Sequence, residues 1–261
     1  MRKFADRMKQ WQIVHIDETD STNRWLRNSQ GENPSPCCKA VWADFQTAGR
    51  GCGTNVWESE RGQNLTFSVL IHPTDIPAQR QFTISMAAAL AVVDALADYA
   101  DGFSIKWPND IYWHDRKICG MLIENRLTEG MIKDSIIGIG LNVNQQRFVS
   151  DAPNPVSLRQ IIGRATDRQE LLEKVLNRLS LPADANRYRS LLYRREGYHP
   201  YRDAAGDFEA RLEAVEDDGH LVLQDTDGHT RRYAFKEVIF KIMPEMRNSE
   251  TSKYRNIELS K

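Results

Sequence analysis

Four short segments of this 261-residue chain combine glycine with polar and charged residues, the residue types that can contact a small charged molecule. They span residues 20–23 (DSTN), 46–57 (QTAGRGCGTNVW), 106–120 and 138–144 (GIGLNVN). In the second segment, glycines at positions 49, 51 and 53 allow the backbone to approach an anion closely. Arg50 adds a planar charge between them. This segment is neither a P-loop nor a dinucleotide-binding fingerprint. A flexible hairpin turn is the simpler alternative for its glycines.

A lysine and two glycines stand where apolar strands are expected. Lys117 begins the apolar run 118–123, and a lysine that enters a buried strand needs an anionic partner, such as a bound carboxylate or phosphate. A solvated lysine is the alternative. Gly138 and Gly140 interrupt a β-branched run, which commonly marks close approach of a ligand or another backbone. The DSTN segment has a simpler interpretation too, as the N-cap of a helix.

The elements that must position these residues alternate between strands and helices over the first three quarters of the chain. Short apolar runs at 13–16, 41–45, 65–71, 118–124 and 132–143 predict strands. Between them, residues 81–93 carry no charge and repeat apolar residues at helical spacing, which predicts a helix packed on a sheet. Residues 157–196 read as helical, with a break at Pro182. This order predicts a mixed α/β layer.

From about residue 197 the pattern changes to a period of two, which is typical of short strands. Residues 208–214 alternate apolar and charged side chains, and Asp-Gly pairs at 218–219 and 227–228 predict hairpin turns. We therefore expect three parts: a large α/β domain over 1–196, a small all-β domain over 197–243, and a polar, mobile tail over 244–261.

Composition narrows the function classes. The chain has 35 basic and 36 acidic residues, a formal net charge of −1, so no basic domain or stripe points to nucleic acid. No signal-peptide core is present, and no run approaches the roughly 18–20 apolar residues of a spanning helix. The four cysteines, at 37, 38, 52 and 119, form no CxxC pair, so we expect no zinc site or other protein-held metal. The sequence predicts a soluble protein of a reducing cytoplasm, with no DNA or membrane partner.

The order and spacing of these strings resemble the biotin–protein ligases. The matching strings are DSTN (20–23), QTAGRG (46–51), the tryptophan at 57, KWPNDIY (106–112), RKICGMLIE (116–124) and GIGLNVN (138–144). The resemblance covers about residues 11–147. It implies an α/β (α+β) catalytic domain with a mixed sheet, like those of biotin ligases and class II aminoacyl-tRNA synthetases. A small SH3-like barrel is implied after it.

The resemblance also implies an activity. Such an enzyme joins biotin and ATP into biotinyl-5′-AMP, releasing pyrophosphate, and then transfers the biotinyl group to a specific lysine of a biotin carboxyl carrier protein. Mg²⁺ would accompany ATP as a cofactor, and biotin would be a substrate. No covalent enzyme intermediate is expected.

By match to the family's strings, each site residue receives an implied role. The biotin-binding residues would be Ser21, Thr22, Asn23, Gln46, Gly49, Arg50, Gly51, Cys52, Lys117, Gly120, Gly138 and Gly140. The ATP-binding residues would be Trp57, which would cover the adenine side, with Lys106, Asn109 and Asn142. Lys117, Arg50 and Asp110 would be catalytic. Asp110 would orient or deprotonate the acceptor amine, with a structural turn role as the alternative.

The chain departs from the family pattern at two places. Position 52 is a cysteine where an arginine is usual, and a thiol cannot grip a phosphate, so we expect the adenylate to be held less tightly. Arg61 is one residue that would supply the missing charge. Only nineteen residues precede Asp20, too few for the winged helix-turn-helix that some members carry, so no repressor role is expected.

Two other functions compete with this interpretation. A lipoate or octanoyl ligase or transferase shares the general fold, although its pocket strings differ. A catalytically weak sensor of biotin or biotinyl-AMP is suggested by Cys52, although Lys117, Arg50 and Asp110 are retained. The sequence leaves open which carrier protein is modified and whether the protein is a monomer or a homodimer.

Overall fold

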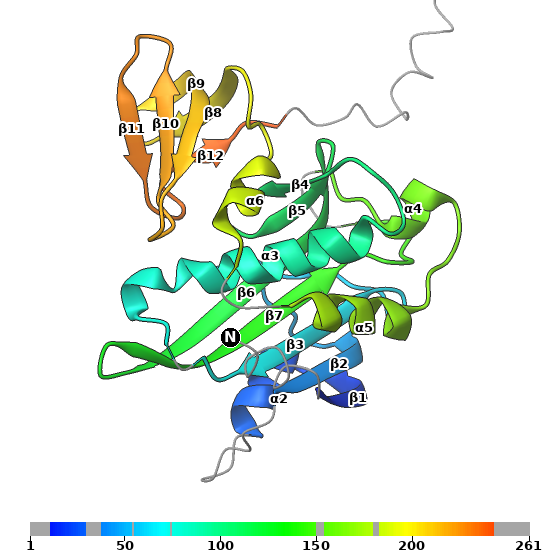
Figure 1. Cartoon of the computed structure of the whole chain (residues 1–261). Coiled ribbons are helices and arrows are strands. Elements are labelled where there is room, and N and C mark those ends of the chain that lie inside the picture. The colour runs from blue at the N-terminus through cyan, green and yellow to red at the C-terminus, as the bar shows by residue number, and fades with distance from the viewer. Residues whose placement is uncertain are drawn as a thin grey trace, which may run out of the picture.

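A computed structural model describes residues 11–29, 38–53, 55–73, 75–149, 154–179 and 183–242. The predicted tail over 244–261, Cys37 and Pro182 lie outside these residues. The described chain contains a large seven-stranded sheet, a smaller five-stranded sheet and the helices between their strands (Figure 1).

The large sheet is mixed, as the sequence predicts. Its strands are β1 (Gln12–Thr19), β2 (Lys39–Gln46), β3 (Leu65–Ile71), β4 (Phe103–Lys106), β5 (Asp110–Trp113), β6 (Arg116–Thr128) and β7 (Met131–Leu141), in the spatial order β1-β2-β3-β7-β6-β5-β4. Helix α2 (Thr22–Asn28) connects β1 to β2, and these two strands are parallel. Every other neighbouring pair in this sheet is antiparallel. β3 is buried along its whole length, which matches its unbroken apolar run.

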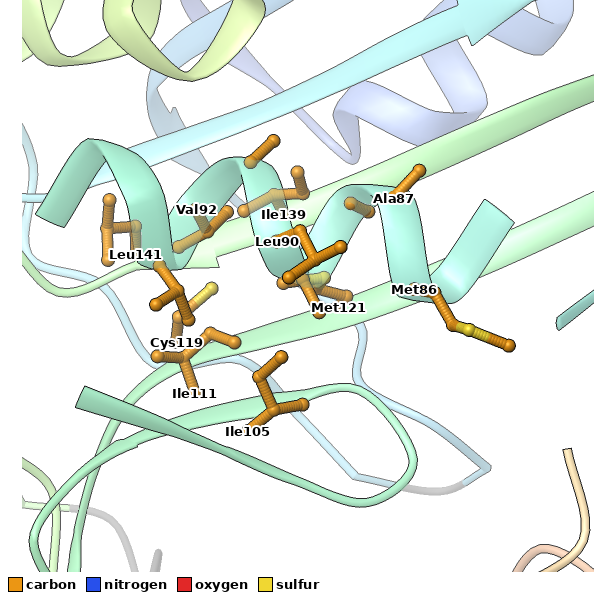
Figure 2. Close-up of a cluster of buried hydrophobic side chains, with 14 of the residues drawn as sticks. Met86, Ala87, Leu90, Val92, Ile105, Ile111, Cys119, Met121, Ile139 and Leu141 are labelled. Atoms are coloured by element: carbon orange, nitrogen blue, oxygen red, sulfur yellow. The ribbon is translucent and has the colours of Figure 1, made fainter. Parts of the chain in front are cut away.

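Helix α3 (Phe82–Leu96) lies across one face of this sheet, as the uncharged run at 81–93 predicts (Figure 1). Its side chains meet alternate residues of the strands, and Cys119, Met121, Ile139 and Leu141 point toward it in Figure 2. Successive residues of a strand face opposite sides of the sheet, so the even-numbered residues next to these in β6 and β7 face away from α3. Those even positions include Gly120, Gly138 and Gly140.

The remaining helices come from the segment at 157–196. They are α4 (Leu158–Ile162), α5 (Arg168–Arg178) and α6 (Ala185–Ser190). A single 3-10 turn, η1 (Ala78–Arg80), lies outside this segment and precedes α3. Ser157 and Gln160 cap α4 reciprocally, and aspartate side chains at 167 and 184 accept hydrogen bonds at the starts of α5 and α6. The apolar stripe of α5 packs against α3. None of the described helices has both the length and the apolar character needed to cross a membrane.

The second sheet is wholly antiparallel. It contains β8 (His199–Asp203), β9 (Gly206–Val215), β10 (Leu221–Asp225), β11 (Thr230–Tyr233) and β12 (Ile239–Phe240), in the order β11-β10-β9-β8-β12. The two Asp-Gly pairs form its turns, with Gly219 and Gly228 at φ of +93° and +85°. Both glycines adopt the left-handed backbone that the turns require.

Specific contacts join this sheet to the first. The indole nitrogen of Trp107, between β4 and β5, donates to the carbonyl of Gly219 at 2.9 Å. Arg194 lies between α6 and β8 and donates to the carbonyl oxygens of Pro200 and Lys241, at 3.1 and 2.8 Å, while the N–H of the adjacent Tyr193 donates to the carbonyl of Ile105 in β4 at 2.9 Å. The second sheet therefore stands against the β4–β5 end of the large sheet, beside the segments that the sequence singles out.

Candidate functional site

The four segments predicted to carry chemistry converge on one pocket of about 690 Å³. Its lining comes from the start of α2, the loop after β2, the β4–β5 hairpin, the centres of β6 and β7, and residues 235–242 at the end of the second sheet. Fifteen of the predicted site residues line it: Ser21, Thr22, Asn23, Gln46, Arg50, Gly51, Cys52, Trp57, Lys106, Asn109, Asp110, Lys117, Gly120, Gly138 and Gly140. The pocket lies on the face of the sheet away from α3.

One end of the pocket is a neutral, hydrogen-bonded cluster at the start of α2. The backbone N–H and Oγ1 of Thr22 both donate to Oε1 of Gln46, at 2.8 and 3.0 Å. Asn23 donates to Oε2 of Glu124 at 2.9 Å. Ser21 is the N-cap residue, but its side chain makes no capping hydrogen bond. Helix capping therefore does not account for its hydroxyl, which lies among the residues that line the pocket.

Two supporting residues of this cluster were not predicted from the sequence. Ser68 Oγ lies 2.7 Å from Oγ1 of Thr22 and 2.6 Å from Oδ1 of Asn23, and Ser68 is fully buried. Glu124 also pairs with Arg27 at 2.7 Å. Both residues could have been found from the sequence, because buried polar groups need hydrogen-bond partners. Ser68 is a hydroxyl within the apolar run LTFSVLI, and Glu124 is a carboxylate at the end of the apolar run 118–123.

Glycines make the floor of the pocket thin. Gly120 and Gly140 stand opposite each other in the β6–β7 ladder, and Gly138 is two residues away on the same face. A Cβ atom at position 138 would lie 2.3 Å from Oδ1 of Asn23, and one at 140 would lie 2.3 Å from the Trp57 ring. Any larger residue would therefore displace a neighbour.

The loop after β2 folds into the pocket as a narrow hairpin. The N–H of Gly51 donates to the carbonyl of Asn55 at 2.7 Å, and the N–H of Trp57 donates to that of Gly49 at 3.1 Å. The Trp57 ring rests on Gly120 and Gly140, and its buried indole nitrogen has no hydrogen-bond partner. The family resemblance implies that these glycines contact biotin and that Trp57 covers the adenine; in this structure the indole ring itself covers the glycines.

The opposite end of the pocket is cationic. Nζ of Lys117 pairs with Oδ1 of Asp110 at 2.8 Å, with side chains 25% and 20% exposed. Lys106 lies over the rings of Tyr112 and Phe240, with Nζ 5.6 and 4.8 Å from their centroids. Burial lowers the pKa of Lys106, and the nearby carboxylate of Asp110 opposes that shift.

The charges around the pocket are unequal in number. Its described lining contains one carboxylate, Asp110, and five cationic side chains, Arg50, Lys106, Lys117, Lys236 and Lys241. Arg61, expected as a possible substitute for the arginine missing at position 52, is not among the lining residues. It pairs with Glu18 and lies over Phe45 instead. Lys241 pairs with Asp207 outside the lining, but the remaining cations still outnumber the carboxylate, which favours a polyanionic ligand.

Two predicted site residues lie outside the lining. Gly49 is buried at the base of the loop, where a Cβ atom would lie 2.7 Å from the carbonyl of Trp57. Asn142 is buried and donates to the carbonyl of Val156 at 3.1 Å, which joins the end of β7 to the segment before α4. A direct contact between Asn142 and a nucleotide stays a prediction that this placement does not support.

Potential metal ligands gather elsewhere on the described surface. The three groups are His15 with Asp17 and Asp44, Glu216 with Asp218 and His220, and Asp225 with Asp227 and His229. None of these residues lines the pocket. The aspartates at 44, 218 and 225 already pair with arginine side chains. These groups therefore contribute nothing to the chemistry of the pocket.

Comparison with known proteins agrees with the arrangement of these segments. Residues 16–142 match the biotin/lipoate A/B protein ligase family. The chain is 32% identical over 245 residues to the bifunctional ligase/repressor BirA of Bacillus subtilis, covering 85% of this chain and 72% of that protein. It is 30% identical over 238 residues to the biotin–[acetyl-CoA-carboxylase] ligase of Paracoccus denitrificans, covering 82% of this chain and 94% of the other. This chain belongs to the biotin–protein ligase family.

A solved structure of the biotin–protein ligase family has the same fold. The biotin protein ligase of Aquifex aeolicus, in complex with biotin and ATP, superposes with a TM-score of 0.71 and 26% sequence identity. The match covers 89% of this chain and 99% of the other, so it includes both sheets. The resemblance stated from the sequence strings and the mixed α/β fold are thereby confirmed.

The contact between Trp57 and the glycine floor can be tested by a mutant cycle. We expect Gly140→Ala to lower the free energy of unfolding by about 1–3 kcal/mol, because the new methyl group overlaps the indole. In a Trp57→Ala background, Gly140→Ala should lower the free energy of unfolding by much less. Urea unfolding of the natural protein, the two single variants and the double variant would measure this difference. An equal cost in both backgrounds would show that the ring does not rest on Gly140.

Proposed function

We propose that this protein activates biotin with ATP as biotinyl-5′-AMP and transfers the biotinyl group to a lysine of a biotin carboxyl carrier protein. The supporting observation is that one pocket runs from a neutral hydrogen-bonding cluster, over a glycine floor, to a group of cations. This order matches the parts of biotinyl-AMP, namely a neutral bicyclic ring, an aliphatic chain and a phosphate ester.

The neutral cluster suits the ureido ring of biotin. That ring both donates and accepts hydrogen bonds, and hydroxyl and amide groups can do both in return. Ser21 offers a hydroxyl that the helix does not use, and Thr22 and Asn23 are held in place by Gln46 and Ser68. The aliphatic tail would then cross Gly120 and Gly140, so the Trp57 ring must leave the floor or repack along the tail.

In the first step the carboxylate of biotin attacks the α-phosphorus of ATP. A new oxygen–phosphorus bond forms, and the bond to pyrophosphate breaks. Lys117 is placed to bind the carboxylate once it exchanges its present partner, Asp110. Arg50 extends from the glycine loop and, among the described residues, has no carboxylate partner, so its charge is available to phosphate oxygens. Fixed cations stabilise the charge that builds on the transferred phosphoryl group.

Mg²⁺ would arrive with the nucleotide, because this ion commonly binds through phosphates, water and only one or two protein carboxylates. Asp110 is the carboxylate of the described lining that fits this role, since the other lining groups are cationic, amide, hydroxyl or apolar. Bound there, the ion would neutralise part of the triphosphate charge.

In the second step the ε-amine of the acceptor lysine attacks the carbonyl carbon of the adenylate. An amide bond forms and AMP leaves. Asp110 is the first residue of β5, directly after the β4–β5 turn. Its carboxylate would orient the amine and accept its proton. The ion pair with Lys117 also holds the hairpin against β6, so a structural role for Asp110 is the alternative.

We further propose that the second sheet forms an SH3-like domain over about 197–243, after a catalytic domain over 1–196. Support comes from its five short antiparallel strands and their Asp-Gly turns. A cytoplasmic location is also proposed, which fits the free thiols of Cys38, Cys52 and Cys119.

The decisive assay combines the protein with biotin, Mg²⁺ and α-labelled ATP, with and without a carrier domain. We expect labelled biotinyl-AMP and pyrophosphate in the absence of the carrier, and a biotinylated lysine in its presence. Lys117→Met should slow adenylate formation at least about a hundredfold, by the loss of a charge-assisted contact to the reacting groups. Lys133→Met, which removes an exposed lysine far from the lining, should have no effect.

The outcomes separate the candidate functions. Adenylate without transfer would favour the biotinyl-AMP sensor, and no adenylate would overturn the proposal. Adenylation of lipoate or octanoate in preference to biotin would favour the lipoate or octanoyl alternative.

The cysteine at position 52 generates a prediction about the intermediate. Cys52 lines the pocket beside Arg50, but a thiol cannot form the two parallel hydrogen bonds with which an arginine binds a phosphate bidentately. We expect Cys52→Arg to slow release of biotinyl-AMP by about tenfold, measured by chasing the labelled adenylate with unlabelled ligand. Cys52→Ser serves as the control, and an unchanged release rate for Cys52→Arg would contradict the prediction.

A further inference from the structure

Lys236 is a lining residue of the pocket that comes from the second sheet. It stands in the turn between β11 and β12, and its φ of +74° lies in the left-handed region. Glycine adopts this backbone conformation without strain, whereas it is unfavourable for a lysine. Strain of this kind at a residue that faces a ligand pocket points to a use for the side chain.

The ammonium group of Lys236 lies at the glycine loop. A Cβ atom added at Gly53 would lie only 2.3 Å from Nζ of Lys236, so the ammonium closely approaches the backbone next to Cys52. This is the place where the family usually has an arginine. The absence of a side chain at position 53 leaves room for the lysine to enter.

Within the described residues, no carboxylate neutralises Lys236. The adjacent Glu237 does not do so, because its Oε2 accepts from the backbone N–H of Ala234 at 2.7 Å. Besides its approach to Gly53, the ammonium lies over the Phe235 ring, 5.8 Å from the ring centroid. By contrast, Lys117 and Lys241 pair with aspartates. An unpaired cation at the edge of a pocket is suited to binding an anionic ligand.

The turn that carries Lys236 is held against the wall of the pocket. Phe235 meets the Trp107 ring edge-on at a centroid distance of 6.3 Å, and Trp107 also donates to Gly219 of the second sheet. Within the turn, the N–H of Glu237 donates to the carbonyl of Ala234 at 3.2 Å. Lys236 is therefore presented from a fixed support.

We propose that Lys236 binds phosphate oxygens of the nucleotide and of biotinyl-AMP, supplying from the second sheet the cation that position 52 lacks. This inference rests on the proposed function. It assigns the second sheet a direct part in holding the reactive intermediate and names the residue responsible.

Lys236→Gly in the full-length protein tests the proposal. Glycine favours a positive φ, so this variant should melt at the same or a higher temperature than the natural protein. Its KM for ATP and its rate of adenylate release should nevertheless each rise about tenfold, the value of one charge-assisted hydrogen bond. Lys236→Arg should retain nucleotide binding, and Lys133→Met should match the natural protein throughout.

A second substitution tests whether positions 52 and 236 serve the same phosphate. Cys52→Arg should restore most of the loss in the Lys236→Gly background, because the new guanidinium would replace the missing ammonium. Failure of this rescue would overturn the proposal, as would a Lys236→Gly protein whose KM for ATP and adenylate release are within twofold of the natural values.

The failure of this inference can be distinguished from the failure of the proposed function. If the natural protein forms no biotinyl-AMP, the proposed function fails and this inference falls with it. If the natural protein forms the adenylate and Lys236→Gly behaves identically, only the inference fails.

Discussion

The ion pair between Lys117 and Asp110 is the interaction on which the pocket depends. Both charges lie largely buried beside the apolar strands β5 and β6, where either one alone would be costly. Each neutralises the other in the ligand-free protein. We propose that a ligand that binds Lys117 offers an anion in place of Asp110, and that the carboxylate of Asp110 then faces a cation, either Mg²⁺ or an incoming amine. In this proposal, the pair links binding of an acid to exposure of a carboxylate.

The sheet supplies the rigidity that this exchange needs. The backbone of Lys117 is held on two sides, because it faces Tyr112 of β5 and exchanges hydrogen bonds with the segment 154–156. Alternation along β6 and β7 turns the apolar residues toward α3 and the glycines toward the pocket. The same two strands therefore contribute to the hydrophobic core on one face and form the glycine floor of the pocket on the other.

Local sequence patterns predicted five strands of the large sheet and the long helix, but not the short strands β4 and β5. The uninterrupted apolar run at 65–71 has the same first and last residues as β3. The uncharged run at 81–93 begins one residue before α3, which continues to Leu96. Gly120, Gly138 and Gly140 were recognisable because glycine is unfavourable within a strand. Contacts between distant segments carry no such local signal. The support from Ser68, the inward placement of Trp57 and the approach of Lys236 each depend on packing between elements remote in sequence.

We propose that Lys117 releases Asp110 and binds the carboxylate of biotin in its place. Calorimetric titration with biotin and with biotinol, its uncharged alcohol analogue, tests this most directly. We expect the natural protein to bind biotin at least about tenfold more tightly than biotinol, and Lys117→Met to lose most of that difference. Equal affinity of the natural protein for the two ligands would show that Lys117 does not bind the carboxylate of biotin.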